Sequence, residues 1–240
     1  MQIFYSAIAL QKEALKRKKL GETIGFVPTM GALHSGHTSL LDCARKQCDW
    51  LVCSIFVNPL QFTTSEDFDL YPSDFEGDKR KCQAHSVDAL FCPPELYHQD
   101  HSSYLRVEKL SQGLCGSDRP SHFEGVTTVV ARLFGIVQPD IAVFGQKDYQ
   151  QLAIIRRMVR DFAMPVKIIG APLVREESGL ALSSRNRYLS SENKRRALSL
   201  SKTLQEIQRL FKKENITNCA QLKKLAGNLL DVDQLDYLEI

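Results

Sequence analysis

"TIGFVPTMGALHSGHTSLL" (residues 23–41) is the stretch of sequence that decides the fold. It starts with a nearly continuous apolar run, 23–27, of the kind found in strands that are covered on both faces. Two glycines and two histidines follow, and apolar residues then recur at helical spacing from Leu40 to Cys48. The order strand, glycine-bearing turn, helix predicts the opening of a βα unit.

The same alternation continues along the chain to about residue 174. Further strands are expected at 50–57, 88–92, 141–145 and 166–174, and helices at 37–48, 126–137 and 149–162. The β-branched residues of 126–137 leave a strand open there as well. Strands that alternate with helices predict an α/β fold with a doubly wound, Rossmann-like parallel sheet.

The pattern changes after about residue 175, which suggests a second, smaller domain. A long amphipathic helix is expected over 190–215, with Ser190 or Ser191 as its N-cap, then a helix near 217–230 and a possible strand at 235–240. The predicted domains are therefore 1–174, a Rossmann-like ligand-binding domain, and 175–240, a small α+β domain.

Composition excludes several classes of protein. The 240 residues carry a net charge of only +3, which argues against a dedicated nucleic-acid binder. The seven cysteines are scattered without a Cys-x-x-Cys pair, as in proteins of a reducing compartment. No secretory signal and no apolar run of membrane-spanning length is present, so a cytoplasmic location without membrane contact is expected.

Ligands of open parallel sheets bind beyond the carboxyl ends of the strands, so the residues after each apolar run are the candidates for a site. Four such stretches are polar and suit a nucleotide and a small acid: "PTMGALHSGH" (28–37), "NPLQF" (58–62), "GQKDYQQ" (145–151) and "REESGLALSSRN" (175–186). We expect them to meet in one crevice.

The first of these stretches predicts a phosphate site. Gly31 and Gly36 permit close approach of the backbone to a ligand, and a helix that begins near Ser35 offers free N–H groups. The three-residue spacing puts His34 and His37 on one face of that helix, where their imidazoles oppose the charge on a phosphate. The alternative is structural: one histidine bonds the helix N-terminus and the other packs in the core.

The other stretches supply charges and hydroxyls. Lys147 suits the phosphates of ATP, although a solvated loop lysine is the common alternative. Asp148 is suited to cap the next helix, to orient Lys147, or to contact a ribose or a metal. Ser183, Ser184 and Arg185 match phosphate oxygens, but a hydroxyl turn that caps a helix explains them equally.

Three carboxamides point to the second substrate. Asn58, Gln61 and Gln151 both donate and accept hydrogen bonds, which suits a small molecule with hydroxyls and a carboxylate.

Six motifs carry a family resemblance, and they are "PTMGALHSGH", "SIFVNPLQF", "YPSDFEGD", "RPSHFEGV", "FGQKDYQQL" and "LALSSRNRYLS". With these motifs, from residue 28 to about 190, the chain resembles the pantothenate synthetases of the His-x-Gly-His nucleotidylyltransferase superfamily. The resemblance implies that pantoate attacks the α-phosphate of Mg-ATP to give pantoyl adenylate and pyrophosphate. The amine of β-alanine then displaces AMP and forms pantothenate.

The resemblance also implies roles for individual residues. His37 would be the catalytic proton donor, with His34, Lys147 and Arg185 acting on the phosphates. Gln61 would bind pantoate and β-alanine, with Asn58 and Gln151 on pantoate. The ATP site would comprise Met30, Gly31, Ala32, Leu33, His34, Ser35, Gly36, His37, Gly145, Gln146, Lys147, Asp148, Val174, Leu182, Ser183, Ser184 and Arg185.

Other expectations concern the metal and the assembly. Magnesium is expected with ATP, with Asp78 as its candidate ligand, and the protein is expected to be a homodimer. The second domain is expected to act as a lid, and it looks shortened because the sequence stops at residue 240. Leu182 stands where some relatives have methionine, an apolar exchange that should be harmless.

Two other functions compete with the ligase. One is another His-x-Gly-His nucleotidylyltransferase that acts on a small acid or alcohol. The other is a non-catalytic nucleotide or RNA binder with the same fold, against which the weak net charge speaks.

Overall fold

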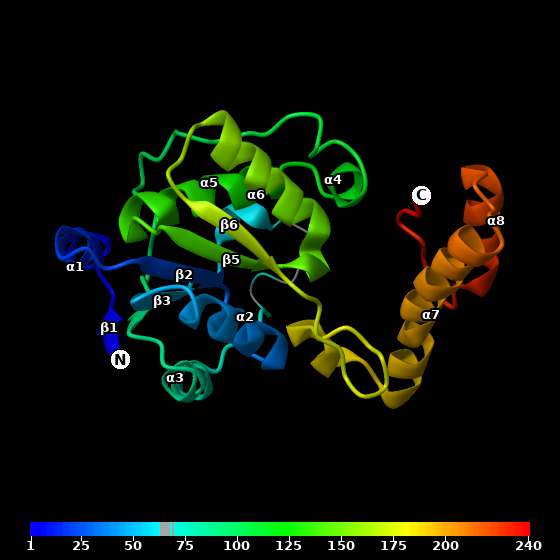
Figure 1. The fold of residues 1–240 in the computed structure, drawn as a ribbon, viewed down its shortest axis with the longest axis horizontal. Coiled ribbons are helices and arrows are strands. Elements are labelled where there is room, and N and C mark those ends of the chain that lie inside the picture. Colours follow the sequence, from blue (N-terminus) through cyan, green and yellow to red (C-terminus); the bar gives the residue numbers. More distant parts are fainter. Residues whose placement is uncertain (63–67, 69) are drawn as a thin grey trace. The chain divides into compact units, whose positions relative to one another are not determined.

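The chain forms two compact units, Met1–Leu173 and Val174–Ile240. In sequence, this division lies one residue from the expected boundary between 174 and 175. The computed structural model describes residues 1–62, 68 and 70–240 (Figure 1).

The first unit is built on one six-stranded sheet in which all neighbouring strands run parallel. The order across the sheet is β1-β4-β3-β2-β5-β6. The strands are β1 (Gln2–Phe4), β2 (Ile24–Thr29), β3 (Trp50–Ile55), β4 (Ala89–Phe91), β5 (Ile141–Gly145) and β6 (Lys167–Ala171). The predicted doubly wound sheet is confirmed. The sequence pattern did not predict β1, because three residues at a sheet edge are too few to show alternation.

Helices cover both faces of this sheet (Figure 1). On one face lie α1 (Ala7–Lys19), α5 (His122–Val137) and α6 (Tyr149–Asp161), and on the other α2 (Ser35–Arg45) and α3 (Phe75–Ala84). Shorter elements are η1 (Pro59–Gln61), α4 (Cys115–Asp118) and η2 (Gln146–Asp148).

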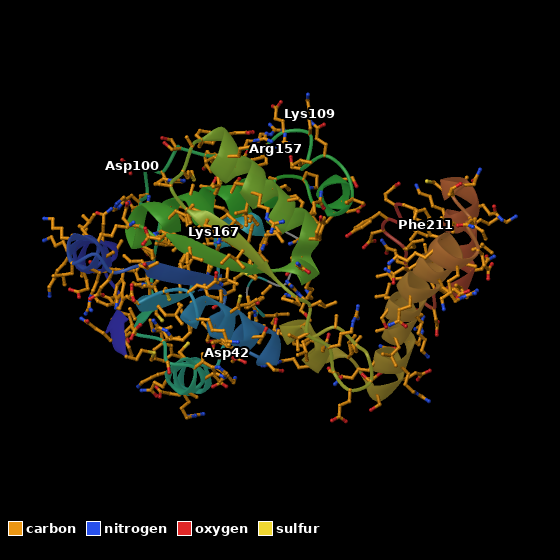
Figure 2. All side chains as sticks on the ribbon, in the orientation of Figure 1. Asp42, Asp100, Lys109, Arg157, Lys167 and Phe211 are labelled. Carbon is orange, nitrogen blue, oxygen red and sulfur yellow. The ribbon has the colours of Figure 1, made fainter. Side chains whose placement is uncertain are left out.

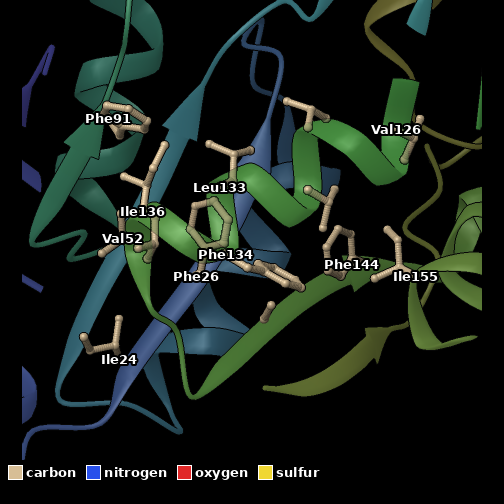
Figure 3. Close-up of a cluster of buried hydrophobic side chains, with 14 of the residues drawn as sticks. Ile24, Phe26, Val52, Phe91, Val126, Leu133, Phe134, Ile136, Phe144 and Ile155 are labelled. Atoms are coloured by element: carbon tan, nitrogen blue, oxygen red, sulfur yellow. The ribbon is translucent and has the colours of Figure 1, made fainter. Parts of the chain in front are cut away.

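Each face has its own apolar core, as the continuous apolar strands predict. Neighbouring residues of one strand divide between the two cores: Phe26 packs with α5 and α6, and Val27 packs with α2. Figure 3 shows the first core, in which Phe134 meets both Phe26 and Phe144 edge to face.

The sequence allowed either a strand or a helix at residues 126–137. In the structure these residues belong to helix α5. Burial explains why β-branched residues are tolerated there, since the helix is apolar on nearly all sides and lies inside the unit. Thr127 donates its hydroxyl to the carbonyl of Phe123 at 2.8 Å, so even its polar atom is satisfied within the helix.

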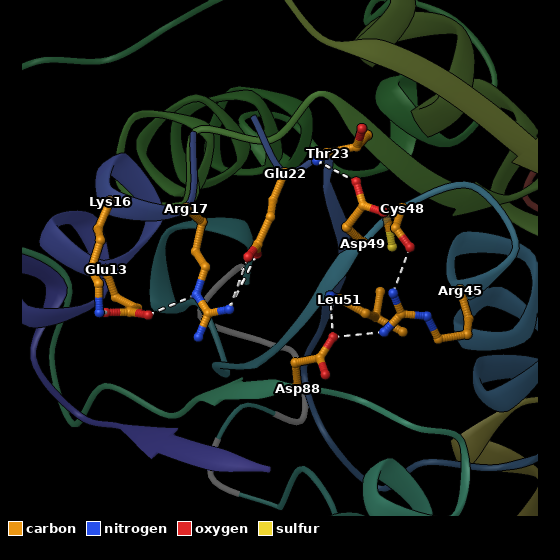
Figure 4. A network of polar contacts seen from close by, with 10 residues as sticks. All are labelled: Glu13, Lys16, Arg17, Glu22, Thr23, Arg45, Cys48, Asp49, Leu51 and Asp88. Carbon is orange, nitrogen blue, oxygen red and sulfur yellow. Dashed lines mark hydrogen bonds and ion pairs between the residues drawn. The ribbon is translucent and has the colours of Figure 1, made fainter. Parts of the chain in front are cut away.

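Three aspartates pin the amino-terminal edge of the sheet. Each directly precedes a strand, and its carboxylate accepts a backbone N–H at the start of a neighbouring strand. Figure 4 shows two of them, Asp49 and Asp88. These bonds join Asp49 to Thr23 (2.8 Å), Asp88 to Leu51 (2.7 Å) and Asp140 to Ile24 (2.8 Å). Arg45 also donates to Asp88 (2.6 Å) and Lys18 to Asp140 (2.7 Å), so two of the three carboxylates are paired with a cation as well.

The second unit is mainly helical, with α7 (Ser191–Lys213) and α8 (Cys219–Leu229) packed on each other after the short η3 (Ser184–Tyr188). Ser190 is the N-cap of α7 and accepts the N–H of Asn193 at 3.1 Å. The strand considered for 235–240 is not formed, because this segment has no strand beside it, among the described residues, with which to pair. Phe211 projects from α7 with 52% of its surface exposed (Figure 2).

Within the part of the chain that the structure describes, no helix is both long enough and apolar enough to cross a membrane.

Candidate active site

The strand order places the candidate site at the carboxyl ends of β2 and β5. From β2 the chain adds β3 and β4 on one side and later β5 and β6 on the other, so the direction of winding reverses between β2 and β5. Ligands bind at this point in open α/β sheets. The loop after β2 carries residues 30–34, and η2 follows directly after β5.

The loop after β2 has an unusual backbone, with positive φ at Gly31 (88°) and Ala32 (51°). Both oxygens of Asp78, on α3, hold it in that shape by accepting the N–H groups of Ala32 and Leu33, each at 2.7 Å. Lys81, about one turn further along α3, donates to the carbonyl of Leu33 at 2.6 Å. Helix α3 therefore fixes the conformation of the loop.

Asp78 was expected to bind magnesium, but in the structure both of its carboxylate oxygens accept backbone N–H groups. Its side chain is only 1% exposed, and its oxygens face backbone N–H groups. Burial raises the pKa of this carboxyl, although the two N–H bonds and Lys81 act to lower it. Among the described residues, no group of three or more His, Cys, Asp or Glu side chains could hold a metal ion.

His34 and His37 form a capping box at the start of α2. His34 is the N-cap, and its Nδ1 accepts the N–H of Gly36 at 3.1 Å, while His37 Nδ1 accepts the N–H of His34 at 3.3 Å. The ring centroids are 4.0 Å apart. Because Nδ1 is the acceptor in both rings, the neutral imidazoles carry their protons on Nε2.

His37 stays neutral near pH 7. Its pKa is lowered to about 3, mainly by burial and also by the electrostatic influence of His34, Lys147 and Lys81. A neutral ring with Nε2–H is a hydrogen-bond donor and not an acid at neutral pH. Strand β2 pairs with β5, and helix α2 packs against β5, so the loop after β2 and η2 both follow neighbouring strands at the same edge of the sheet.

Lys147 and Asp148 lie side by side on η2. The ammonium of Lys147 is 3.1 Å from Asp148 Oδ1, and both side chains are exposed. This contact is compatible with a role of Asp148 in orienting Lys147, one of the alternatives that the sequence left open. Gln151, in the first turn of α6, is half-buried and makes no side-chain hydrogen bond to the described residues.

Gln61 reaches this region from η1, which follows β3. Its Nε2 donates to the sulfur of Met30 at 2.9 Å, and its Oε1 accepts from Asn58 Nδ2 at 3.3 Å. Asn58 is 1% exposed and also contacts the carbonyl of Gly125 (3.1 Å) and the hydroxyl of Tyr97 (2.9 Å). Asn58, expected on the substrate, is thus buried and orients Gln61.

Gly145 ends β5 and Gln146 begins η2, both in the first unit, whereas the predicted residues between Val174 and Arg185 belong to the second unit. Ser183 accepts the N–H of Arg185 at 3.3 Å and caps η3, which is the hydroxyl turn offered as the structural alternative. The backbone N–H of Leu182 donates to the carbonyl of Val174 at 3.1 Å. Ser184 is buried.

Two contacts around the site have no counterpart in the sequence-based predictions. One is the contact of Asp78 with the loop after β2, and the other joins His122 Nδ1 to the carbonyl oxygen of Gln61 in η1, 2.8 Å apart. Both residues lie in stretches that were recognised as motifs, 71–78 and 119–126, to which no structural role was given. A local signal did exist for α3, since Asp74 caps it and Glu76 lies in its first turn.

Comparison with known proteins agrees with this geometry. The profile of the Pantoate-beta-alanine ligase family matches residues 2–240. A pantothenate synthetase of Sulfurihydrogenibium sp. (strain YO3AOP1) is 48% identical over all of this chain and 88% of its own length. One of Geotalea uraniireducens (strain Rf4) is 47% identical over all of this chain and 86% of its own length.

Solved structures are similar as well. Pantothenate synthetase from Thermus thermophilus has a TM-score of 0.89 at 44% identity, over 95% of this chain and 82% of that one. Pantoate-beta-alanine ligase from Francisella tularensis, complexed with Beta-gamma ATP and β-alanine, has a TM-score of 0.76 at 34% identity, over 95% and 86% of the two chains. With the profile and the sequence relatives both spanning the chain, it belongs to the pantoate–β-alanine ligase family.

Proposed function

We propose that this chain joins pantoate to β-alanine at the expense of ATP, through a pantoyl adenylate, and releases AMP and pyrophosphate. The observation that carries the proposal is the histidine pair at the start of α2, in which each Nδ1 accepts a backbone N–H, at the switch point between β2 and β5. The family membership supports the same reaction over the two competing functions.

In the first half-reaction the protein acts mainly by position and charge. The N-terminus of α2 and the Nε2–H groups of His34 and His37 would donate to the phosphates of ATP, and Lys147 would add a positive charge. One such preorganised donor typically contributes about 3–4 kcal/mol to the transition state. His37 would act as a hydrogen-bond donor rather than as the acid that the resemblance implied, because its pKa is lowered to about 3.

Gln61 and Gln151 would bind the small substrates. The contact with Asn58 engages the carbonyl oxygen of Gln61, and Met30 accepts one hydrogen of its NH₂ group, so the second N–H would donate to the carboxylate or a hydroxyl of pantoate. We propose that Gln61 also contacts β-alanine.

The second unit would complete the phosphate site. Ser183, Ser184 and Arg185 would bind the triphosphate, and Val174 and Leu182 would contact the nucleotide, which gives this unit the role of a lid. A lid matters here because water would hydrolyse an acyl adenylate.

Magnesium would accompany ATP as its phosphate complex. Mg²⁺ usually keeps several waters and takes only one or two protein carboxylates. The ion would then be held mainly by phosphate oxygens and water.

Two further expectations, a homodimer and a cytoplasmic location, stay predictions. Sedimentation velocity on the purified protein tests the first, since a monomer at micromolar concentration would contradict it. Fractionation of the source cells tests the second.

An AMP-release assay with Mg-ATP tests the proposed reaction. We expect pyrophosphate only when pantoate is present, and pantothenate with sustained AMP release only when β-alanine is added too. Absence of AMP with all three substrates would refute the proposal. Pyrophosphate release that depends on some other acid or alcohol would favour the other nucleotidylyltransferase.

A further inference from the structure

The position of Gln61 depends on a very short element. Helix η1 has three residues, and its two backbone bonds are long, from Gln61 N–H to Asn58 (3.3 Å) and from Phe62 N–H to Pro59 (3.2 Å). A 3₁₀ turn of this length has poor hydrogen-bond geometry, so its place is set by what it packs against. Helix α5 is the element that it contacts most.

Gly125 brings the backbone of α5 directly against η1. A Cβ atom at this position would lie 2.1 Å from the carbonyl oxygen of Leu60 and 2.6 Å from the backbone nitrogen of Gln61. No side chain fits there. The first turn of α5 is therefore the surface on which η1 rests.

His122, the first residue of α5, binds the same turn through a hydrogen bond. Its Nδ1 is 2.8 Å from the carbonyl oxygen of Gln61, and its Nε2 is 3.2 Å from Arg119 Nη1. A carbonyl only accepts and a guanidinium only donates, so Nδ1 carries the proton and Nε2 accepts. Arg119 thereby fixes the tautomer that His122 needs.

We propose that His122 is a positioning residue for substrate binding: its Nδ1–H holds the backbone of Gln61, and with it the carboxamide that faces the small substrates. The side chain is 8% exposed, which suits a supporting role better than contact with a substrate. The proposal rests on the proposed function for the identity of the substrates, but not for the contact itself.

Matched variants separate this role from simple packing. The amide nitrogen of asparagine can take the place of Nδ1–H, whereas the longer glutamine places its amide where Nε2 lies. We expect His122→Asn to stay within about twofold of the wild type, and His122→Gln to raise KM for pantoate by roughly three- to tenfold, the worth of one neutral hydrogen bond. KM for ATP should stay unchanged in both variants, because the loop after β2, which we propose to lie at the phosphates, is held by α3 and not by His122.

Two measurements make the test decisive. In a Gln61→Ala background, His122→Gln should add no further change in KM for pantoate, since its effect acts through Gln61. Amide hydrogen exchange of Gln61 and Phe62, followed by NMR, should be faster in His122→Gln and unchanged in His122→Asn.

The outcomes are separable. Equal exchange in both His122 variants, or equal KM values for pantoate, would overturn the proposal. If the wild type makes no AMP at all, the proposed function fails, and the exchange data still decide whether His122 holds η1.

Discussion

Acidification should destabilise the folded chain through His37. Its pKa is lowered from the ordinary value of 6.5 to about 3, because burial and the neighbouring positive groups oppose a charge on the ring. Between these two values the unfolded chain binds a proton at His37 that the folded chain does not bind. The free energy of unfolding must then fall as the pH is lowered through 6.5.

The size of the effect follows from the same shift. Each pH unit below the unfolded-state pKa costs about 1.4 kcal/mol for one such group. Going from about pH 7 to about pH 5 should therefore remove about 2 kcal/mol of stability through His37 alone. Near pH 7 the contribution vanishes, since His37 is mostly neutral in both states.

Urea unfolding at the two pH values measures this loss. Trp50 is the single tryptophan and is 4% exposed in β3, so its fluorescence reports the first unit. His37→Asn is the matched variant, because an amide oxygen can still accept the N–H of His34 but does not ionise. The wild type should lose about 2 kcal/mol more than the variant over this pH range. An equal loss in both proteins would refute the reasoning, since every other titratable residue is shared.

Three further predictions address the supports of the site and its main charge. Asp78→Asn replaces one acceptor oxygen by an NH₂ group, so it leaves one backbone N–H of the loop after β2 unpaired. Urea unfolding should show that the free energy of unfolding falls by about 1–3 kcal/mol, and KM for ATP should rise. Unchanged values of both quantities would contradict the role of Asp78. Gly125→Ala should raise KM for pantoate by about tenfold or more in the AMP assay, because its Cβ would overlap the backbone of η1. Its control, Gly135→Ala on the same helix, has open space around the new methyl group and should leave KM unchanged. Lys147→Met should lower kcat by about 100- to 1000-fold with an unchanged circular dichroism spectrum, if its charge stabilises the transition state; a loss below about tenfold would argue against that role.

The general position of the site could be predicted because it follows from topology. Apolar runs covered on both faces indicate parallel strands, and the carboxyl ends of parallel strands share one edge. The polar stretches around His37 and Lys147 were therefore expected at one edge of the sheet, and they follow β2 and β5, which are neighbouring parallel strands. Ser190 was among the expected N-cap positions for a simpler reason, since a cap depends on neighbouring residues only.

Contacts between distant segments could not be predicted in this way. Asp78 lies 46 positions from Ala32, and its local sequence fits a metal ligand and a backbone acceptor equally well. Asn58 is another case: a carboxamide after a strand suits a substrate, but Tyr97 and Gly125 use its polar atoms inside the protein. The strand considered at 235–240 failed because an apolar alternation does not show whether a pairing strand is present.

The aspartates at the opposite edge of the sheet have a consequence for distances at the site. Strands β2 and β3 both have six residues and pair in register from Ile24–Trp50 to Thr29–Ile55. The aspartates fix both strands near their first residues, so the two strands, being equal in length, also end side by side. Met30 and Gln61 can meet beyond the carboxyl ends of these strands because the register between β2 and β3 is fixed. The spacing of Met30 and Gln61, two residues that we propose to contact the substrates, therefore depends on side chains at the opposite edge of the sheet, a full strand length away.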